Sequence, residues 1–224
     1  MSGGVIVTGG FGALGRAVVE HLAQAGHQVA AVDLAPAPAA FNGALALGGV
    51  DLTDEAAVTA AYAQAAEQLG GIAAVVNIAG GFVWETMEGG SLANWDKMYQ
   101  MNLRTAATSA SAALPHLTQN GGAIVNIGAA AASQPATGMA PYTASKAGVA
   151  ALTASLAEEL RGRGVRVNAI LPTIIDTPTN RADMPDADTS AWVKPSSVAK
   201  VIAFLISDEA GAITGASIPL SLAG

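Results

Sequence analysis

Short apolar stretches alternate with longer stretches of helical periodicity along the whole chain. The apolar stretches predict strands at residues 5–7, 28–33, 44–50, 72–79, 123–127, 165–171 and 217–220. The longer stretches predict helices at residues 16–25, 54–69, 91–117, 142–161 and 196–206. A helix between two strands normally forms a right-handed crossover that joins parallel strands. We therefore predict one α/β domain over residues 1–224, with three layers and a doubly wound parallel sheet of about seven strands.

A glycine-rich turn, TGGFGALG at residues 8–15, joins the first predicted strand to the first predicted helix. Gly9 allows a tight reversal of the chain, and Gly15 allows the helix to pack closely. Gly12 and Ala13 let the backbone approach a pyrophosphate, which the N–H groups of such a turn and the positive end of the helix bind. The turn predicts a dinucleotide-binding site, and a turn that binds nothing is the alternative.

Asp33 ends the next apolar stretch, roughly 20 residues beyond the glycine turn. A carboxylate at this place accepts hydrogen bonds from the ribose hydroxyls of adenosine and repels a 2′-phosphate. Asp33 therefore favours NAD over NADP. An ordinary aspartate that faces water at the end of a strand is the alternative interpretation.

The composition is that of an apolar and acidic protein. The 224 residues include no cysteine, which excludes a disulfide framework and thiolate chemistry. Because 51% of them are hydrophobic and 12% charged, we expect part of the surface to be buried in a homodimer or homotetramer. The net charge of −7 argues against binding to nucleic acid or to an anionic membrane. The early first strand leaves no room for a signal peptide, and no long apolar run follows, so we expect a cytoplasmic protein.

Tyr142 and Lys146 stand four residues apart at the start of a predicted helix and therefore share one helix face. A lysine ammonium beside a phenol favours the phenolate, so this spacing predicts a lowered pKa for Tyr142 and a role in proton transfer. Asn102 lies in the middle of the predicted helix 91–117, where a buried amide needs a partner. For each feature taken singly there is an alternative. The Tyr142–Lys146 spacing can arise by chance, and Asn102 can simply be hydrogen-bonded to the backbone.

These motifs occur in the order and spacing of the short-chain dehydrogenase/reductase family, which the chain resembles over essentially its whole length. The resemblance implies a Rossmann fold and a nicotinamide dinucleotide cofactor. It implies that Tyr142 is the catalytic acid/base, that Lys146 binds the nicotinamide ribose and tunes Tyr142, and that Asn102 holds a water in a proton relay. It also implies that subunits pair through the helices at 91–117 and 142–161.

The resemblance further implies which residues surround the cofactor. Besides Tyr142 and Lys146 they are Gly9, Phe11, Gly12, Ala13, Leu14, Asp33, Asp51, Leu52, Ala79, Gly80, Gly81, Pro172, Ile174, Ile175 and Thr177. Within this set Asp51 and Leu52 border the adenine, and the residues from Pro172 to Thr177 meet the nicotinamide carboxamide.

One position departs from the family pattern. The family carries a serine 13 residues before the tyrosine, where its hydroxyl polarises the substrate carbonyl, and this chain has Ala129 there. Loss of a donor aimed at a developing oxyanion costs on the order of 10²- to 10³-fold in rate. Ordinary ketone reduction is therefore expected to be compromised unless Ser133, four residues further on, replaces the serine.

A narrower resemblance, to the dihydropteridine reductase family, accounts for the missing serine. It rests on residues 171–192 and on Ala79-Gly-Gly-Phe82, and that family also lacks the serine. It implies a quinonoid dihydropterin substrate, whose conjugated ring accepts hydride without a polarising hydroxyl. The long irregular segment 172–195 predicts an active-site lid. Trp192 within it is a candidate for stacking on a flat substrate, with a packing role as the alternative.

The sequence thus predicts an NADH-dependent oxidoreductase whose small-molecule substrate resembles a quinonoid dihydropterin. A general carbonyl or alcohol oxidoreductase that uses Ser133 or water is the first alternative. A dinucleotide-binding sensor with weak catalysis is an alternative of a different class. His21, His27 and His116 show no ligand spacing, so no metal site is predicted.

Overall fold

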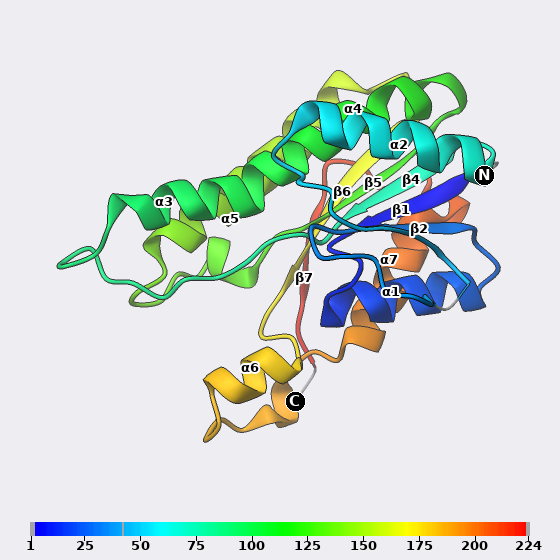
Figure 1. The fold of residues 1–224 in the computed structure, drawn as a ribbon. Helices are drawn as coiled ribbons and strands as arrows, with labels where there is room; N and C mark the ends of the chain where they lie inside the picture. Colours follow the sequence, from blue (N-terminus) through cyan, green and yellow to red (C-terminus); the bar gives the residue numbers. More distant parts are fainter. Residues whose placement is uncertain (1–2, 42, 223–224) are drawn as a thin grey trace.

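Seven parallel strands form one sheet in the order β3-β2-β1-β4-β5-β6-β7 (Figure 1). The computed structural model describes residues 3–41 and 43–222, and it confirms the predicted doubly wound α/β fold. The strands are β1 (Gly4–Thr8), β2 (Val29–Val32), β3 (Leu45–Leu47), β4 (Ile72–Asn77), β5 (Gly122–Ile127), β6 (Val165–Pro172) and β7 (Ser217–Leu220). The strand order reverses between β1 and β4, so the carboxyl ends of these strands border the crevice where ligands bind in such sheets.

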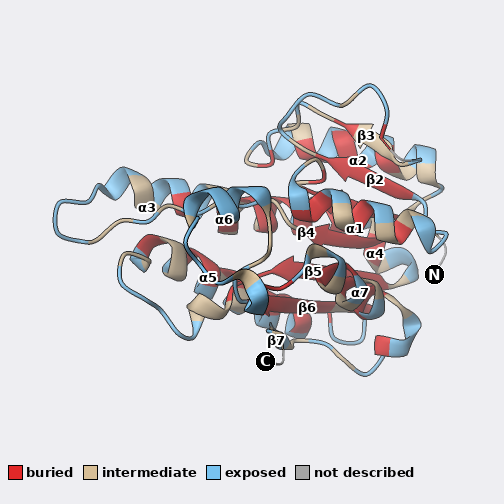
Figure 2. Cartoon of the chain, turned by 90° about the horizontal axis from the view of Figure 1, so that it is seen from below, coloured by how far each residue is buried: buried red, intermediate tan, exposed pale blue. Residues whose placement is uncertain are grey.

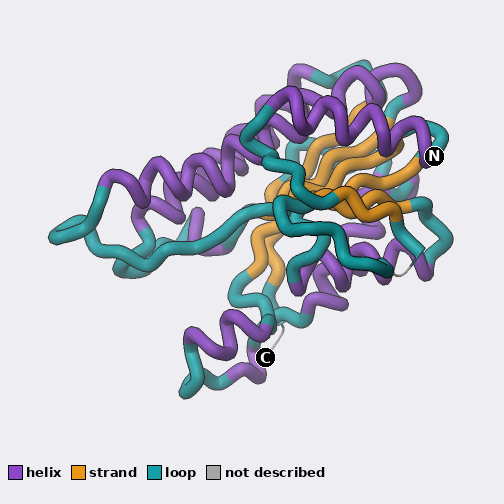
Figure 3. The backbone as a smooth tube through the Cα atoms, in the orientation of Figure 1, coloured by secondary structure: helices purple, strands orange, loops and turns teal. Residues whose placement is uncertain are grey.

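Helices cover both faces of the sheet (Figure 3). One face packs against α1 (Ala13–Gln24) and α7 (Pro195–Ile206), and the other packs against α2 (Glu55–Leu69), α4 (Thr105–Asn120) and α5 (Ala140–Glu159). In α7 the buried residues Val198, Ile202 and Leu205 recur at helical spacing and form the stripe that meets the sheet. Figure 2 shows that the central strands are buried, and the edge strand β7 is the exception, with partly and fully exposed residues.

Local signals in the sequence set several boundaries. The Asp54 carboxylate accepts hydrogen bonds from the N–H groups of Ala56 and Ala57 and so caps α2, which ends at Gly70 with a φ of +70°. Helix α1 begins at Ala13 rather than at residue 16, because the end of the glycine turn is already helical. Strand β3 is shorter than the predicted stretch 44–50.

The predicted helix 91–117 is a run of three helical segments. It comprises α3 (Leu92–Met98), a π-helix (Tyr99–Arg104) and α4. The wider turns of a π-helix are found mostly as single insertions in α-helices, frequently at functional sites. Asn102 lies in this π-helix and is 1% exposed, so the predicted buried amide is confirmed.

A chain of hydrogen-bonded side chains crosses the interior on the α2–α4–α5 side of the sheet. We call it the buried polar chain, and its members are Tyr62, Ser109, Asn77, Asn126 and Thr153. The Tyr62 and Ser109 hydroxyls bond to each other, and Ser109 donates to Asn77 Oδ1. Asn77 Nδ2 donates to Asn126 Oδ1 at 2.8 Å, and Asn126 Nδ2 donates to Thr153 Oγ1 at 2.9 Å. It joins three helices to β4 and β5.

The segment 172–195 contains more regular structure than the sequence predicts. It forms α6 (Pro178–Asp183) and a 3-10 turn (Thr189–Ala191), and a parallel bridge joins Ile175 to Val193. Thr177 explains the helix, since its hydroxyl accepts the N–H of Asn180 and caps α6. Figure 1 shows α6 standing away from the sheet, beyond the carboxyl ends of the strands.

Two further 3-10 turns, Ala130–Ala132 and Asp208–Ala210, complete the described elements. Within residues 3–41 and 43–222, no helix is long and apolar enough to cross a membrane.

Candidate active site

The glycine turn after β1 is held close to the segment that follows β4. Gly9 has a φ of +63°, and a Cβ on it would lie 2.9 Å from the backbone nitrogen of Ala79. A Cβ on Gly15 would lie 2.1 Å from the carbonyl oxygen of Gly9. Both glycines are therefore required by the fold itself. At Gly12, by contrast, a Cβ would meet Gly9 O alone, at 3.4 Å, so the protein leaves this side of the turn open.

The start of α1 has the properties of a phosphate site. Gly12 is the N-cap residue of α1 and provides no side-chain cap, and the first turn carries no acidic residue. The leading N–H groups and the positive end of the helix dipole therefore remain available to an anion. Together with the open side of Gly12, this arrangement fits the pyrophosphate of a dinucleotide. A bound nicotinamide dinucleotide would supply or accept a hydride here.

Asp33 lies at the end of β2 with its carboxylate fixed toward the glycine turn. Its Oδ2 accepts the N–H of Phe11 at 2.9 Å, and its Oδ1 accepts the N–H of Ala35 at 3.0 Å. Each carboxylate oxygen retains further acceptor capacity for a ribose hydroxyl. The nearby Arg16 donates to Phe11 O at 2.8 Å, and its guanidinium lies 5.2 Å from the centre of the Phe41 ring.

The loop after β3 carries Asp51 and the buried Leu52 next to this carboxylate. The N–H of Val50 donates to the carbonyl of Asp33 at 3.0 Å, so the two strand ends lie side by side. Asp51 Oδ1 accepts the N–H and the hydroxyl of Thr53, which lowers the pKa of the Asp51 carboxyl. The structure thus brings Asp51 and Leu52 close to Asp33, while their contact with an adenine stays a prediction.

Tyr142 and Lys146 lie in the first turns of α5, as their spacing predicts. Lys146 is buried, and its Nζ donates to the carbonyl of Ile127, at the end of β5, at 2.7 Å. Burial lowers the pKa of Lys146 to about 8 and raises the pKa of Tyr142 to about 12. The predicted lowering of the Tyr142 pKa is therefore wrong for this structure. The desolvation of the phenol dominates, and the ammonium is directed to the Ile127 carbonyl.

Asn102 connects the π-helix to both sides of the site. Its Oδ1 accepts the N–H of Gly81 at 2.9 Å, and its Nδ2 donates to Gly81 O at 3.1 Å and to Ser145 Oγ at 3.0 Å. A Cβ on Gly80 would approach Asn102 Oδ1 to 2.5 Å and Lys146 Nζ to 3.4 Å. Asn102, Gly80 and Lys146 therefore converge, while a water held by Asn102 stays a prediction.

Ala129 is buried and extended at the beginning of the turn after β5, with 5% of it exposed. Its methyl group offers no hydrogen bond where the family pattern has a hydroxyl. Ser133 lies at the other end of the short 3-10 turn and is exposed, with its N–H bound to Ala130 O. The structure shows no contact that directs the Ser133 hydroxyl toward Tyr142 among the described residues.

An aromatic residue that the sequence reasoning missed packs directly on the candidate catalytic tyrosine. The Phe82 and Tyr142 rings meet edge to face, with their centres 5.0 Å apart and an interplanar angle of 87°. Phe82 follows the Gly80-Gly81 pair, so an aromatic residue directly after a strand-end glycine pair was the available signal. Ser145, which binds Asn102, was also missed.

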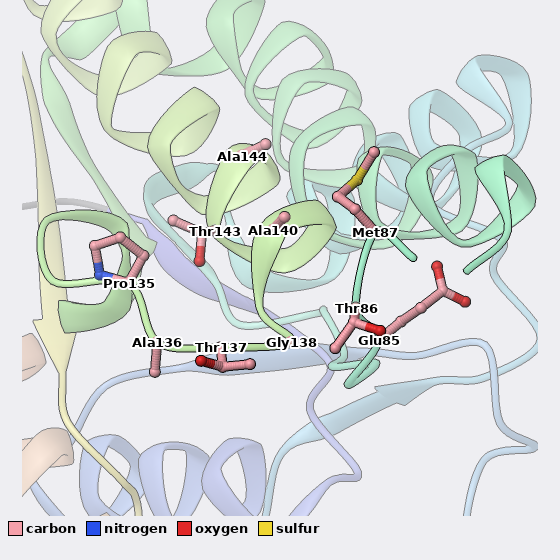
Figure 4. Close-up of a pocket in the computed structure, with 10 residues that line it drawn as sticks. All are labelled: Glu85, Thr86, Met87, Pro135, Ala136, Thr137, Gly138, Ala140, Thr143 and Ala144. Carbon is pink, nitrogen blue, oxygen red and sulfur yellow. The ribbon is translucent and has the colours of Figure 1, made fainter. Parts of the chain in front are cut away.

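An open hollow of about 500 Å³ lies at the start of α5, between the segments that follow β4 and β5 (Figure 4), on the helix face that carries Ala140, Thr143 and Ala144 rather than Tyr142. Its wall includes Met87 from the segment after β4, and Pro135, Ala140 and Thr143 from the segment after β5 and the start of α5 (Figure 4). The Thr143 hydroxyl is buried without a hydrogen-bond partner in the described structure. The hollow therefore offers mostly apolar surface next to the candidate catalytic helix.

The residues predicted to meet the nicotinamide lie after β6. Pro172 is buried, Ile174 is exposed, Ile175 bridges to Val193, and Thr177 is occupied as the cap of α6. Trp192 is 4% exposed, which corrects the stacking hypothesis. Almost none of its surface remains accessible to a substrate, so a packing role fits the structure better than stacking.

The comparisons with known proteins agree with this geometry. The family model described as short chain dehydrogenase matches residues 4–188. The chain is 36% identical to the 4-formylbenzenesulfonate dehydrogenase TsaC1/TsaC2 of Comamonas testosteroni, over 94% of this chain and 92% of that protein. It is 35% identical to the 2,5-dichloro-2,5-cyclohexadiene-1,4-diol dehydrogenase LinX of Sphingobium indicum, over 96% and 93% of the two chains.

A solved structure extends the similarity to three dimensions. It is the 3-ketoacyl-(acyl-carrier-protein) reductase from Brucella melitensis complexed with NADH, which superposes with a TM-score of 0.86. The sequence identity is 26%, and the match covers 97% of this chain and 96% of that one. With its glycine turn, its tyrosine–lysine pair and these matches, the chain belongs to the short-chain dehydrogenase family.

Proposed function

We propose that this protein is an NADH-dependent reductase of a planar, conjugated substrate, with Tyr142 as the proton donor. The observation that carries the proposal is a complete set of Tyr142, Lys146 and Asn102 beside a buried Ala129. Such a site can deliver a proton, yet it has no hydroxyl at the place where a carbonyl would be polarised. A ring that is already polarised by conjugation is the substrate for which this loss matters least.

Each residue has a defined task in this proposal. Tyr142 gives its proton to the heteroatom of the substrate. Bound NADH would supply the hydride to the conjugated carbon, so the substrate gains two electrons and two hydrogens, one as hydride and one as the Tyr142 proton. Lys146 keeps positive charge near the phenol and binds the ribose of the cofactor. Asn102 holds the backbone at Gly81 and so shapes the floor of the site. A quinonoid dihydropterin-like compound is the first substrate to test.

A second candidate function is a carbonyl or alcohol oxidoreductase in which Ser133 or water replaces the serine. It is favoured by the relatives, whose names describe dehydrogenases of an aldehyde and of a cyclic diol. In the described structure Ser133 is exposed at the end of the turn Ala130–Ala132, and no contact directs its hydroxyl toward Tyr142. A dinucleotide-binding sensor is the third candidate, and the intact proton-transfer set argues against it.

The cofactor preference, the assembly and the location form part of the proposal. NAD over NADP is supported by the Asp33 carboxylate at the ribose position. A homodimer or homotetramer is supported by exposed large apolar residues on the outer helices, such as Leu92 and Tyr99. A small molecule is the proposed partner, and the cytoplasm is the proposed location, consistent with a cysteine-free and acidic chain.

The two enzyme candidates make opposite demands on Ala129 and Ser133. NADH oxidation is measured with a quinonoid dihydropterin, with quinones and with an activated ketone, for the wild type, Ala129→Ser and Ser133→Ala. The proposal expects turnover of the conjugated rings by the wild type and by Ser133→Ala. It expects Ala129→Ser to leave ring turnover equal or lower while ketone turnover rises.

The opposite pattern of results would support the carbonyl or alcohol oxidoreductase. It consists of undetectable turnover of the conjugated rings together with ketone turnover that Ser133→Ala abolishes and Ala129→Ser restores. Tight NADH binding without turnover of any member of the panel would favour the sensor.

A further inference from the structure

The backbone on both sides of Phe82 is fixed by hydrogen bonds to other parts of the site. Before Phe82, the N–H of Gly81 donates to Asn102 Oδ1 at 2.9 Å, and the carbonyl of Gly81 accepts from Asn102 Nδ2 at 3.1 Å. After Phe82 in the sequence, Trp84 Nε1 donates to Thr137 O at 3.0 Å, and the N–H of Glu85 donates to Gly138 O at 2.8 Å. Phe82 therefore lies in a short segment, residues 81–85, whose two ends are both held by hydrogen bonds. We call this segment the strap.

Gly81 and Gly138, which take part in the contacts at the two ends of the strap, also have little space around them. A Cβ on Gly81 would lie 2.5 Å from Met101 Cε, and a Cβ on Gly138 would lie 2.2 Å from the Trp84 ring. Residues 81–85 therefore lie close against Met101 on one side and against Gly138 on the other.

The contact between the two rings leaves part of each available. Phe82 is 48% exposed, so one side of its ring meets Tyr142 while the rest faces the open site. The Tyr142 hydroxyl has no hydrogen-bond partner among residues 3–41 and 43–222, so the protein orients this phenol through packing of its ring. Edge-to-face contact is a directional packing interaction, since it sets the positive edge of one ring against the negative face of the other.

We propose that Phe82 is a positioning residue for Tyr142: held by Asn102 through Gly81, it fixes the phenol ring toward the reacting atom and shields it from water. This inference rests on the proposed function, in which Tyr142 is the proton donor. It assigns the aromatic residue after the glycine pair a task that the family pattern does not give it. It also gives Asn102 a second effect, exerted through the backbone of the strap.

The electrostatics of the tyrosine agree with a shielding role. Burial raises the pKa of Tyr142 to about 12. Phe82 is a large side chain directly on the phenol ring, so truncation of Phe82 admits water to the ring and stabilises the phenolate. A residue that merely filled space elsewhere would leave the titration of Tyr142 unchanged.

The test uses Phe82→Leu and Phe82→Ala in the full chain, with Phe204→Leu as the matched control. Phe204 is 41% exposed and lies on α7, on the opposite face of the sheet. The chain has 3 tyrosines, so ¹³Cζ-labelled tyrosine gives resolvable signals that Tyr→Phe variants assign. The titration of Tyr142 is followed by NMR from neutral to alkaline pH, and steady-state turnover is followed with NADH and the substrate panel.

We expect Phe82→Ala to lower the pKa of Tyr142 by about one unit or more, Phe82→Leu to lower it less, and Phe204→Leu to leave it unchanged. We expect kcat to fall about tenfold or more in Phe82→Ala, with the KM for NADH changed less than about twofold. An unchanged Tyr142 titration in a folded Phe82→Ala variant would overturn the inference. If the panel is not turned over but the titration shifts as expected, the proposed function fails while the positioning contact stands.

Discussion

Tyr62 and Tyr142 differ in what their hydroxyls contact. Tyr62 lies in α2, is fully buried, and bonds to Ser109 within the buried polar chain. Tyr142 lies at the start of α5 against the Phe82 ring, and its hydroxyl is left without a partner in the described part of the protein. Burial raises the pKa of both phenols above the ordinary value. A shifted pKa alone therefore does not identify the catalytic group.

The difference shows how the fold separates structural polar groups from reactive ones. Every member of the buried polar chain uses its hydrogen-bonding atoms within the protein, as the low exposure of its environment demands. Near the carboxyl ends of the strands, by contrast, the Asp33 carboxylate and the Tyr142 hydroxyl can still form hydrogen bonds with a ligand. Four predictions follow from this separation, given from the largest expected effect to the smallest.

Removal of the Tyr142 hydroxyl is expected to affect turnover and not folding. In Tyr142→Phe we expect turnover to fall about 10²-fold or more, as with loss of a general acid. The free energy of unfolding should change by less than about 0.5 kcal/mol, because the hydroxyl makes no internal bond in the described structure. Steady-state kinetics and denaturant titration measure both. Full activity in Tyr142→Phe would end its assignment as proton donor.

Truncation of a side chain in the buried polar chain is expected to lower the stability of the protein and to leave turnover nearly unchanged. Asn77→Ala removes the acceptor of Ser109 and the donor to Asn126, so we expect a loss of about 2 to 3 kcal/mol in the free energy of unfolding. Activity per folded molecule should change little. Urea denaturation against Asn120→Ala, an exposed position at the end of α4, provides the comparison. Wild-type stability in Asn77→Ala would show that the chain contributes little.

The Asp33 carboxylate is expected to discriminate between the two nicotinamide cofactors. We expect NADH to bind about tenfold more tightly than NADPH, because the 2′-phosphate would meet an unpaired carboxylate. Fluorescence titration with both cofactors measures the ratio. Arg16→Ala serves as a control for the nearby guanidinium. Equal affinities in the wild type, with a loss of NADPH binding in Arg16→Ala, would show that Arg16 receives the phosphate instead.

Lys146 is expected to make stability depend on pH in the alkaline range. Burial lowers its pKa from 10.5 to about 8 in the folded protein. Between these values the unfolded chain binds more protons, so the free energy of unfolding rises with pH. From about pH 7.5 to about pH 8.5 the gain should be below about 1 kcal/mol. Lys146→Met should lack this gain, and identical pH profiles of the two proteins would contradict the burial argument.

The order of the elements and the glycine turn could be predicted because their signals are local. Apolar stretches, the Asp54 cap and the glycines at residues 8–15 each act within a few residues. The Phe82–Tyr142 contact and the burial of Trp192 could not, because each depends on segments far apart in the sequence. The pKa of Tyr142 was mispredicted for a related reason. Helical spacing places Lys146 on the same face but does not say where Nζ is directed.

The buried polar chain also constrains the position of every proton along it. It ends at Val149 O, which can accept a hydrogen bond but not donate one, so Thr153 must donate to it. Thr153 Oγ1 then receives from Asn126, Asn126 from Asn77, Asn77 from Ser109, and Ser109 from Tyr62. No member can be turned around alone without setting two donors or two acceptors against each other. One carbonyl in α5 thereby dictates the orientation of two amides and the direction of a phenol proton in α2, on the far side of the same helical layer.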